Sequence, residues 1–337
     1  MVCAGGAFPA TINLTRDCNE GVPMSEYTIC EPDDLRRFTT QVLEATGMSP
    51  AGSLEMATQI VSSDLCGHES HGVRRLRQYV DRVLDKDVDP NAVPTIEHDS
   101  GSLVRLNGNS GYGHLVMQNV TDLLIERARE HGIAAIAAYN LDPAGRFVDF
   151  CERTADAGIA SLFFLNLSGG YKSVAPPNGT EARLATNPIA AGIPRAGAPN
   201  IVVDMATSAV AEGRLNDSKE RGIEVESDWV SKNGHLTSMG GVKGFALAIV
   251  IEALAGSLTG AGTVGNDEVV YRQGVLAIGI DIDKLRPIAD FEADVAKFAQ
   301  YLSDTPVEPG APRVTMPGDR SAVNLEKRLR DGIPIHE

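Results

Sequence analysis

The sequence is poor in basic residues. Against 45 aspartates and glutamates it has 30 lysines and arginines, so its formal net charge is -15 at pH 7. Nucleic acids and anionic membranes are bound through clusters of positive charge. We therefore expect no nucleic-acid partner and no membrane binding. A local basic pocket for a small anion is still compatible with the negative net charge.

Long hydrophobic runs and paired cysteines are also missing. The apolar run from Phe245 to Ile251 is much shorter than the ~20 residues that cross a bilayer, so we expect a core helix. The five cysteines are odd in number and scattered, which argues against a disulfide framework and a cysteine zinc site. Unpaired thiols are typical of reducing compartments, and we expect a cytoplasmic protein.

The composition that is present is that of an ordinary globular protein. Hydrophobic residues make up 43% and charged residues 22% of 337 positions, enough for two domains with a large core. Residues 1–28 lack the features of a signal peptide and are predicted to be a poorly ordered extension. Beyond them, helical and strand-like patterns alternate, which predicts an α/β architecture.

Polar groups that can move protons and bind anions are concentrated between Ser63 and Leu76. Two glycines interrupt the helical pattern there, so Ser70 and His71 are predicted at the start of a helix, where free amides favour anions and lower a histidine pKa. Arg75 follows His71 by one helical turn. A guanidinium that grips a carboxylate, beside an imidazole that passes a proton to the adjacent carbonyl, suits a 2-oxo acid.

Two other interpretations of this stretch stay open. The first is a helix N-terminus with a capping serine and a solvated basic face. The second is a metal hydrolase in which His68 and His71 supply two ligands, although no third ligand is evident in the sequence.

Three glycine- or hydroxyl-rich segments resemble phosphate sites. Residues 204–208 follow a predicted strand and offer amides and hydroxyls, although an ordinary strand-to-helix turn fits them too. Gly240 to Gly244 opens a helix and adds the positive charge of Lys243. Gly260 to Gly265 matches the dinucleotide glycine pattern, but no amphipathic helix follows, so we discard it.

With these motifs in view, a family resemblance is apparent. The segment Gly67–Leu76 resembles the signature of the malate/L-lactate dehydrogenase type 2 family. That family also contains ureidoglycolate and sulfolactate dehydrogenases, diketogulonate reductase and cyclic imino-acid reductases. Other blocks are similar to that family's and occur in the same order, over roughly residues 30 to 335: Thr186–Pro188, Asp204–Ser208, Gly241–Gly244, Glu252–Gly260 and Pro317–Arg320.

The resemblance implies a fold and an assembly. The fold is α/β with a mixed-sheet nicotinamide-binding domain of the sulfolactate dehydrogenase-like type, at residues 106–284, and is not a doubly wound Rossmann fold. A helical domain would be built from both chain ends, residues 29–105 and 285–337. The resemblance further implies a homodimer with the NAD(P)H cofactor near the subunit contact.

The resemblance also implies site residues. His71 would exchange a proton, Ser70 lies beside it, and Arg75 would bind the substrate carboxylate, without a metal. The residues implied at the cofactor are Ser168, Thr186, Asn187, Pro188, Val202, Val203, Asp204, Met205, Ala206, Thr207, Lys243, Gly318, Asp319 and Arg320.

The chain departs from the family pattern in two places. Many members carry a second histidine in a His-x-Gly block, where this chain has Pro143-Ala144-Gly145. Proline cannot exchange a proton. The segment between Trp229 and Gly240 is also short, so a loop that usually precedes the lysine block is trimmed.

From residues and resemblance together we expect an NAD(P)H-dependent oxidoreductase. It would transfer hydride to or from C2 of a small 2-oxo or 2-hydroxy carboxylic acid. The alternatives are a reductase of cyclic 2-imino acids, for which the missing histidine matters less, and a non-catalytic binding protein on the same fold. The sequence does not distinguish NADH from NADPH.

Overall fold

The structure, a computed structural model, describes residues 27–220, 222, 225, 228–265 and 271–336. Residues 1–26 of the predicted extension 1–28 lie outside this range. Tyr27 and Thr28 lie within it and belong to the first strand, β1 (Tyr27–Cys30).

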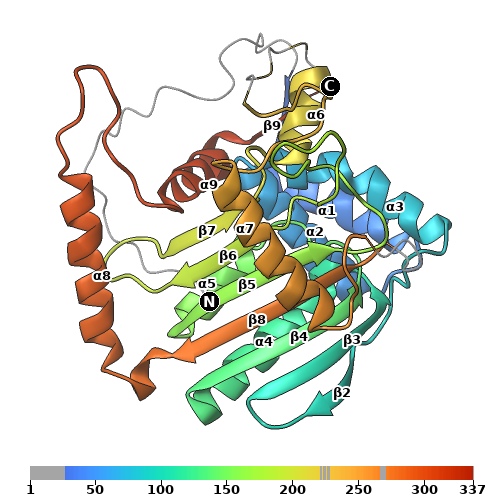
Figure 1. Ribbon diagram of the computed structural model, residues 1–337, viewed down its shortest axis with the longest axis horizontal. Helices are drawn as coiled ribbons and strands as arrows, with labels where there is room; N and C mark the ends of the chain where they lie inside the picture. Colours follow the sequence, from blue (N-terminus) through green and yellow to red (C-terminus); the bar gives the residue numbers. More distant parts are fainter. Residues whose placement is uncertain (1–26, 221, 223–224, 226–227, 266–270, 337) are drawn as a thin grey trace.

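A seven-stranded mixed sheet forms the centre of the molecule (Figure 1). Its strand order is β2-β3-β4-β8-β5-β6-β7, and only the pair β3–β4 is parallel. The strands are β2 (Thr95–Asp99), β3 (Leu103–Gly111), β4 (Ile133–Leu141), β5 (Ile159–Leu167), β6 (Ile189–Ile193), β7 (Ile201–Met205) and β8 (Gln273–Asp281). This mixed sheet confirms the predicted fold class, because a doubly wound fold has a mostly parallel sheet.

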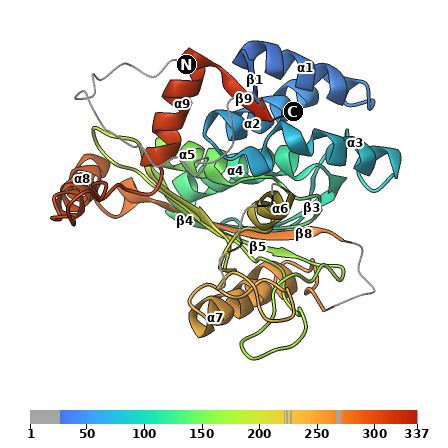
Figure 2. The ribbon, with the colours of Figure 1, turned by 90° about the horizontal axis from the view of Figure 1, so that it is seen from above.

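Two helices cover one face of the sheet and enclose the main core. They are α4 (Gly113–His131) and α5 (Val148–Asp156), which lie on the side of the sheet away from helix α7 of residues 242–251 (Figure 2). Alternate residues of each strand point toward them, as the two-residue period of a strand requires. Ile136, Phe163 and Ala277 are fully buried examples from three neighbouring strands.

A helical cluster lies beside that layer and contains both ends of the described chain. It includes α1 (Pro32–Glu44), α2 (Pro50–Leu65), α3 (Leu76–Leu84) and α9 (Asp319–Asp331). Strand β1 pairs antiparallel with β9 (Ile333–His336) and so ties the two ends together. Helix α8 (Ile288–Ser303), from the same C-terminal region, stands apart at the far edge of the sheet (Figures 1 and 2).

Helix α7 (Val242–Ile251) lies on the opposite face of the sheet and continues as a π-helical turn, Glu252–Ser257. The helix is where the sequence predicts one, but the prediction of a core helix is wrong. Ile249 and Val250 are 49% and 47% exposed. An apolar run indicates that its side chains are shielded from water. It does not show whether they are shielded by the core of the same chain or by another surface. None of the helices in the described ranges has the length and apolar content needed to cross a membrane.

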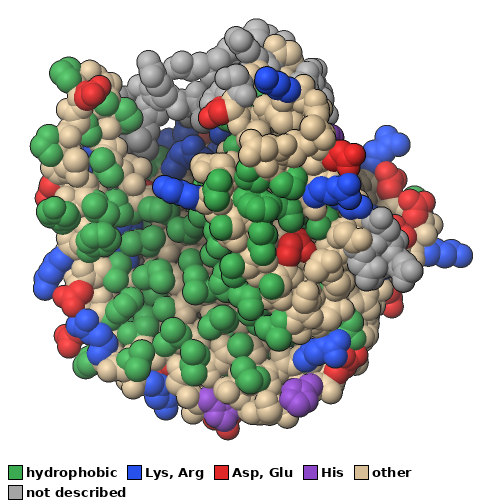
Figure 3. Space-filling view, viewed as in Figure 1, with side chains coloured by type: hydrophobic (Ala, Val, Ile, Leu, Met, Phe, Trp, Pro, Cys, Tyr) green, Lys and Arg blue, Asp and Glu red, His purple; other side chains and the backbone are tan. Residues whose placement is uncertain are grey.

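The sheet face that carries α7 is apolar beyond the helix. Hydrophobic side chains gather across it in the space-filling view (Figure 3). The strand registers place hydrophobic residues on this face along most of β4, β5 and β8, among them Ala135, Leu162 and Ile278. Leu162 is 41% exposed, and Met205 at the end of β7 is 39% exposed. Exposed apolar side chains that gather on one face in this way commonly mark a contact surface.

Candidate active site

The predicted catalytic residues lie on a loop between α2 and α3. Two short 3-10 turns, Glu69–His71 and Val73–Arg75, are separated by Gly72, which is extended (φ -88°, ψ -156°). The prediction that Ser70 and His71 begin a helix with Arg75 one helical turn further on is therefore wrong, and neither 3-10 turn has a side-chain cap. A Cβ on Gly72 would collide with the Asp64 carboxylate, so only glycine fits where the loop crosses α2.

Asp64, in α2, stabilises this loop. It is 1% exposed, and its carboxylate accepts a hydrogen bond from the amide of Val73 at 2.8 Å. Burial raises the pKa of Asp64 to about 7. A buried carboxylate with so few partners is costly unless it has a structural or chemical task. The sequence does not reveal that Asp64 supports this loop. Its place in a helical pattern does not show that Gly72 packs against its carboxylate.

His71 is paired with the serine beside it. The Ser70 hydroxyl lies 3.0 Å from His71 Nδ1. Burial, and then the Arg75 guanidinium, lower the pKa of His71 to about 3. The sequence predicted this direction from a helix dipole, whereas the physical cause is loss of water and a neighbouring positive charge. At neutral pH the ring is uncharged and can accept a proton at Nε2 when Nδ1 carries the hydrogen.

Arg75 is anchored to the same loop. Its Nε donates to the carbonyl oxygen of Ser70 at 2.7 Å. The guanidinium points toward α6 (Glu212–Glu220), where Nη2 lies 3.9 Å from the position of a Cβ on Gly213. The three predicted catalytic residues therefore come together by backbone folding, although not by the helix geometry expected.

One side of α3 extends the site away from His71. Arg75, Tyr79 and Arg82 follow at spacings of four and three residues and so share a face. The Tyr79 ring packs edge-on against His114, with ring centroids 5.2 Å apart. Arg82 binds Asp142 at 2.6 Å and lies over the ring of Tyr271, 5.4 Å from its centroid.

Sequence patterns do not reveal these neighbours because they come from three separate segments. His114 begins α4, Asp142 follows β4, and Tyr271 precedes β8. Tyr171 joins them through a ring contact with Tyr271, at 5.4 Å between centroids, and donates a hydrogen bond to Glu212. Aromatic and charged groups thus surround the loop that carries Arg75.

Among the residues implied at the cofactor, those of β7 and α9 meet. The amide of Val202 donates to the carbonyl oxygen of Pro317 at 3.1 Å, and a Cβ on Gly318 would lie 3.0 Å from the carbonyl oxygen of Asn200. Asp319 is ion-paired with Arg195 at 2.6 Å. Arg320 is exposed in the first turn of α9.

Helix α9 also reaches the loop that carries the predicted catalytic residues. Ser321 Oγ lies 3.1 Å from His68 Nε2, and Arg328 pairs with Glu69 at 2.6 Å. The block that ends in Arg320 and the block that contains His71 are therefore joined by one helix. His68 has its ring nitrogen engaged by a serine rather than directed to a metal ligand set. No cluster of three or more potential metal-ligating side chains occurs within the described ranges.

The end of β7 meets the glycine-rich loop before α7. Thr207 donates through its amide and its hydroxyl to the carbonyl oxygen of Thr186, at 2.9 and 3.0 Å. The carbonyl oxygen of Thr207 accepts from Met239 at 2.9 Å, and a Cβ on Gly244 would lie 2.6 Å from it. Lys243 is exposed at the first turn of α7. Thr186, Thr207 and the backbone at Gly244 thus meet beyond the end of β7, and Lys243 is the residue before Gly244.

The alternation of β7 divides its predicted residues between two faces. Val202 packs into the core beneath α5, and Asp204 accepts a hydrogen bond from the amide of Phe147 at 2.6 Å on the same side. Burial raises the pKa of Asp204 to about 6. Val203 and Met205 lie on the apolar face, with Ala206 just beyond the strand.

Other predicted residues have internal structural partners. Ser168 is fully buried and donates to the carbonyl oxygen of Arg272 at 3.1 Å. Asn187 is fully buried, and its amide nitrogen donates to Glu252 at 2.7 Å. The carbonyl oxygen of the neighbouring Pro188 accepts from Leu165 at 3.1 Å. These side chains brace the segments that carry the exposed residues.

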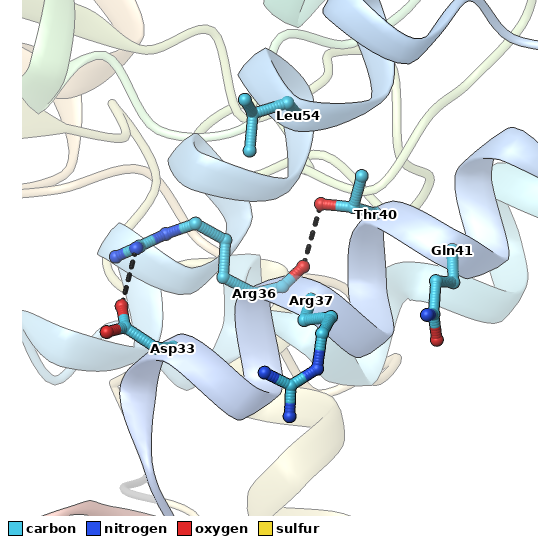
Figure 4. A pocket seen from close by; sticks show the side chains of 6 residues that line it. All are labelled: Asp33, Arg36, Arg37, Thr40, Gln41 and Leu54. Carbon is cyan, nitrogen blue, oxygen red and sulfur yellow. Dashed lines mark hydrogen bonds and ion pairs between the residues drawn. The ribbon is translucent and has the colours of Figure 1, made fainter.

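A shallow pocket of about 350 Å³ lies between α1 and α2, apart from this site (Figure 4). Its two arginines are already paired, Arg36 with Asp33 at 2.8 Å and Arg37 with Asp34 at 2.6 Å. They are satisfied by acids of their own helix, so the pocket is a poor candidate for an anionic substrate.

The mixed sheet and the helical cluster that contains both chain ends make up the fold that the motifs predict. The family profile described as malate/L-lactate dehydrogenase matches residues 30–337. The chain belongs to this family, whose dehydrogenases depend on nicotinamide cofactors and act on small carboxylic acids. This confirms the resemblance found in the motifs.

Individual relatives differ in the substrates that their names state. The chain is 33% identical to an L-lactate dehydrogenase of Cupriavidus necator, over 86% of this chain and 88% of the relative. It is 31% identical to a Delta(1)-pyrroline-2-carboxylate reductase of Pseudomonas fluorescens, over 70% and 74%. The crystal structure of malate dehydrogenase from Entamoeba histolytica has the same fold, with a TM-score of 0.86, 24% identity and coverage of 92% and 94%.

Proposed function

We propose that this protein transfers hydride to or from C2 of a small 2-oxo or 2-hydroxy carboxylic acid, with NADH or NADPH as the cofactor. The observation that carries the proposal is the loop on which Ser70 contacts both His71 and Arg75. An imidazole that is neutral at rest, beside a fixed guanidinium, matches a carbonyl next to a carboxylate.

Arg75 would bind the substrate carboxylate with its terminal nitrogens, because Nε is engaged by Ser70. This would place the carbon next to the carboxylate near His71. In oxidation the neutral imidazole would accept the proton of the hydroxyl group on that carbon, and in reduction the protonated imidazole would return a proton to the oxygen. Ser70 can donate to Nδ1 or accept from it, so it supports either tautomer. The bound nicotinamide supplies or accepts the hydride.

The cofactor-binding residues would be those at the two ends of β7. Gly241 has a φ of 62°, and a Cβ added there would meet nothing within 4 Å, so its backbone is open to a close approach. Exposed Lys243 follows it, at the N-terminus of α7. Gly318 and exposed Arg320 begin α9, and Gly318 lies against Asn200 and Val202 at the start of β7. Each of these helix N-termini, with its cation, suits an anionic group of the cofactor.

A second candidate is the reduction of cyclic 2-imino acids. Pro143 stands where many relatives have a proton-handling histidine, and an imine can bring its own proton from water. The pyrroline-2-carboxylate reductase among the relatives is consistent with this candidate. Arg75 would hold the carboxylate in either reaction.

We further propose a homodimer of a cytoplasmic protein. The apolar sheet face, with Leu162 and Met205 exposed, and the exposed side of α7 form a continuous surface that a second copy would cover (Figure 3). Cys30, Cys66 and Cys151 are free, which suits a reducing compartment. The division into a central nicotinamide-binding domain and a domain built from both chain ends is part of the same proposal.

One experiment tests the function directly. NADH or NADPH is mixed with the purified protein and a panel of 2-oxo acids and five- and six-membered cyclic 2-imino acids, while cofactor absorbance is followed. We expect turnover with at least one carboxylate substrate and none with the matching amides, which lack the charge that Arg75 binds. Activity on imines alone selects the second candidate. No oxidation with any member of the panel contradicts both.

A further inference from the structure

Three neighbouring strands bring aromatic residues together at one end of the central sheet. Gln273, the first residue of β8, is in register with the last residue of β4 and with the last residue of β5. The segments beyond these positions therefore lie side by side, and they carry Asp142, Tyr171 and Tyr271. The rings of Tyr171 and Tyr271 are tilted against each other, with centroids 5.4 Å apart. We call this pair of rings the aromatic wall.

Helix α6 connects the aromatic wall to the loop that carries Arg75. The Tyr171 hydroxyl donates a hydrogen bond to Glu212, the first residue of α6. The next residue, Gly213, lies against the loop, since a Cβ built there would be 3.1 Å from Ser70 Cβ and 3.9 Å from Arg75 Nη2. Two adjacent residues of one helical turn thus contact the aromatic wall and the guanidinium.

Helix α3 makes the second connection. The guanidinium carbon of Arg82 lies over the ring of Tyr271, 5.4 Å from its centroid. Arg82 is two helical turns beyond Arg75, so both side chains leave α3 on the same side. The aromatic wall is therefore tied to Arg75 from two sides, through α6 and through α3.

The arginines beside the aromatic wall are already engaged. Arg82 donates from Nε and Nη2 to Asp142, at 3.0 and 2.6 Å, and from Nη1 to Asp87 at 2.8 Å. Arg272 donates from each of its three nitrogens to oxygen atoms of neighbouring residues. Neither arginine can bind a further anion without breaking these bonds.

The aromatic wall offers apolar surface and has an acidic neighbour. Burial raises the pKa of Tyr271 to about 12, so its hydroxyl is uncharged at neutral pH. Glu212 brings a carboxylate to the hydroxyl of Tyr171. Like charges repel most strongly where little water screens them, so a second acid group would be opposed here. A hydrocarbon group would instead gain contact with the rings.

We propose that the aromatic wall receives the carbon chain beyond C2 of the substrate, and that it selects acids with an apolar side chain over acids with a second anionic group. The inference rests on the proposed function, in which Arg75 binds the one carboxylate. Tyr171 and Tyr271 supply the contact area, and Glu212 repels a second anion. The ring carbons of a cyclic 2-imino acid meet the same requirement, so the selection applies to both candidate reactions.

The first test compares two substrates of similar shape. The acids 4-methyl-2-oxopentanoate and oxaloacetate carry an isobutyl and a carboxymethyl group beyond C2, and these groups differ in charge far more than in size. We expect kcat/KM to be at least about tenfold higher for 4-methyl-2-oxopentanoate, because apolar pockets discriminate by about this factor for a single methylene. An equal or higher kcat/KM for oxaloacetate overturns the inference.

Variants of Glu212 and Tyr171 locate the selection. Glu212→Gln keeps an acceptor for the Tyr171 hydroxyl but removes the charge, so we expect the ratio of the two kcat/KM values to fall about tenfold, mainly through a lower KM for oxaloacetate. Tyr171→Ala should lower kcat/KM for the apolar acid about tenfold, and Tyr171→Phe, which keeps the ring, should lose much less. Glu181→Gln, at an exposed ion pair with Arg183, is the matched control. The same ratio in Glu212→Gln and Glu181→Gln overturns the role of Glu212.

A binding measurement separates this inference from the proposed function. Calorimetric titration of the full chain with each acid, in the presence of NAD⁺ or NADP⁺, measures affinity without reduction of the acid. We expect Kd to be at least about tenfold lower for 4-methyl-2-oxopentanoate than for oxaloacetate. If neither acid is turned over with NADH or NADPH, the proposed reduction of 2-oxo acids fails, while tighter binding of the apolar acid still supports the selection. Equal affinities, or no binding of either acid, overturn the inference.

Discussion

At the scale of single residues, the site depends on groups whose charges are set by burial. His71 and Arg75 are held by bonds to Ser70, and Asp64 holds the loop through the amide of Val73. All three hydrogen bonds lie within the segment Ser63–Leu76, to which the sequence points. No sequence pattern specifies which atoms form them. The consequences can be measured one residue at a time.

The first prediction concerns His71. His71→Ala removes the imidazole that exchanges the proton, and loss of a positioned general acid costs about a hundred- to ten-thousand-fold in rate. We expect kcat to fall by that amount in steady-state assays, while NAD(P)H still binds in a fluorescence titration. Near-normal turnover would show that another group moves the proton.

The second prediction concerns the shape of Arg75. Arg75→Lys keeps the charge but loses the fork that grips a carboxylate with two bonds. Loss of a desolvated charge pair costs about 2–5 kcal/mol, so kcat/KM on carboxylate substrates should fall at least about thirtyfold. If Arg75→Lys and Arg75→Ala both leave kcat/KM unchanged, the carboxylate is bound elsewhere.

The third prediction is the pH dependence that Asp64 gives to stability. Its folded pKa of about 7 lies above the ordinary value of 3.8, so between those pH values the folded state holds a proton that the unfolded state releases. Stability from this group is present below about pH 4 and is lost as pH rises toward 7.

The side chain introduced by Asp64→Asn has no carboxyl group and does not titrate between pH 4.5 and 7.5. Urea unfolding at pH 4.5 and 7.5 should therefore show the variant gaining about 2–4 kcal/mol relative to the wild type at the higher pH, as one pKa unit corresponds to about 1.4 kcal/mol. Asp85→Asn, at an exposed position after α3, is the control. Parallel pH curves for Asp64→Asn and the wild type would mean that Asp64 titrates alike in both states.

At the scale of elements, the sequence predicts the helices and strands that have a repeating apolar pattern. It does not predict contacts that single residues make after the chain has folded. The sequence predicts a helix from its apolar spacing between Leu115 and His131, and strands from the apolar runs Ile133 to Tyr139 and Ile159 to Leu167. The structure has them as α4, β4 and β5. The turn at Gly72 is not predicted, because its extended backbone depends on the Asp64 carboxylate beneath it. His114, Tyr271 and Asp142 were missed for a related reason: they meet α3 only after the sheet has formed.

The fourth prediction belongs to the loop before α7. Lys243→Glu places a negative charge at an exposed helix N-terminus that is proposed to hold cofactor phosphates. We expect the Kd for NAD(P)H to rise at least about tenfold, with the circular dichroism spectrum unchanged. Lys232→Glu, on the segment that precedes the loop, is the control. An unaltered titration in Lys243→Glu would remove this loop from the site.

At the scale of the whole molecule, one sheet face is covered by its own helices and the other is left largely apolar. The sequence showed the hydrophobic strands but not this asymmetry, since a strand with apolar residues on both faces looks the same whether the second face meets a helix or another subunit. The family resemblance, and not the pattern, suggested a homodimer.

The fifth prediction tests that homodimer. Leu162→Glu puts a charge in the middle of the apolar face, where Leu162 is 41% exposed. Burying an unpaired charge against a second copy is unfavourable, so the dimer Kd should rise at least about a hundredfold in analytical ultracentrifugation. Val93→Glu, at a residue 74% exposed outside this face, should leave the dimer intact. Equal masses for Leu162→Glu and the wild type would contradict the proposed interface.

The pairing of β1 with β9 has a consequence for how the chain is made. Ribosomal synthesis releases the Gly67–Leu76 loop long before Arg328 and Ser321, which fasten Glu69 and His68. Until α9 and β9 emerge, the nascent chain carries its histidine loop without these fasteners and with β1 unpaired. Such a chain exposes a strand edge, which chaperones and proteases recognise. A chain truncated before α9 is therefore expected to be prone to aggregation, because β1 has no strand partner and the histidine loop lacks its contacts with α9.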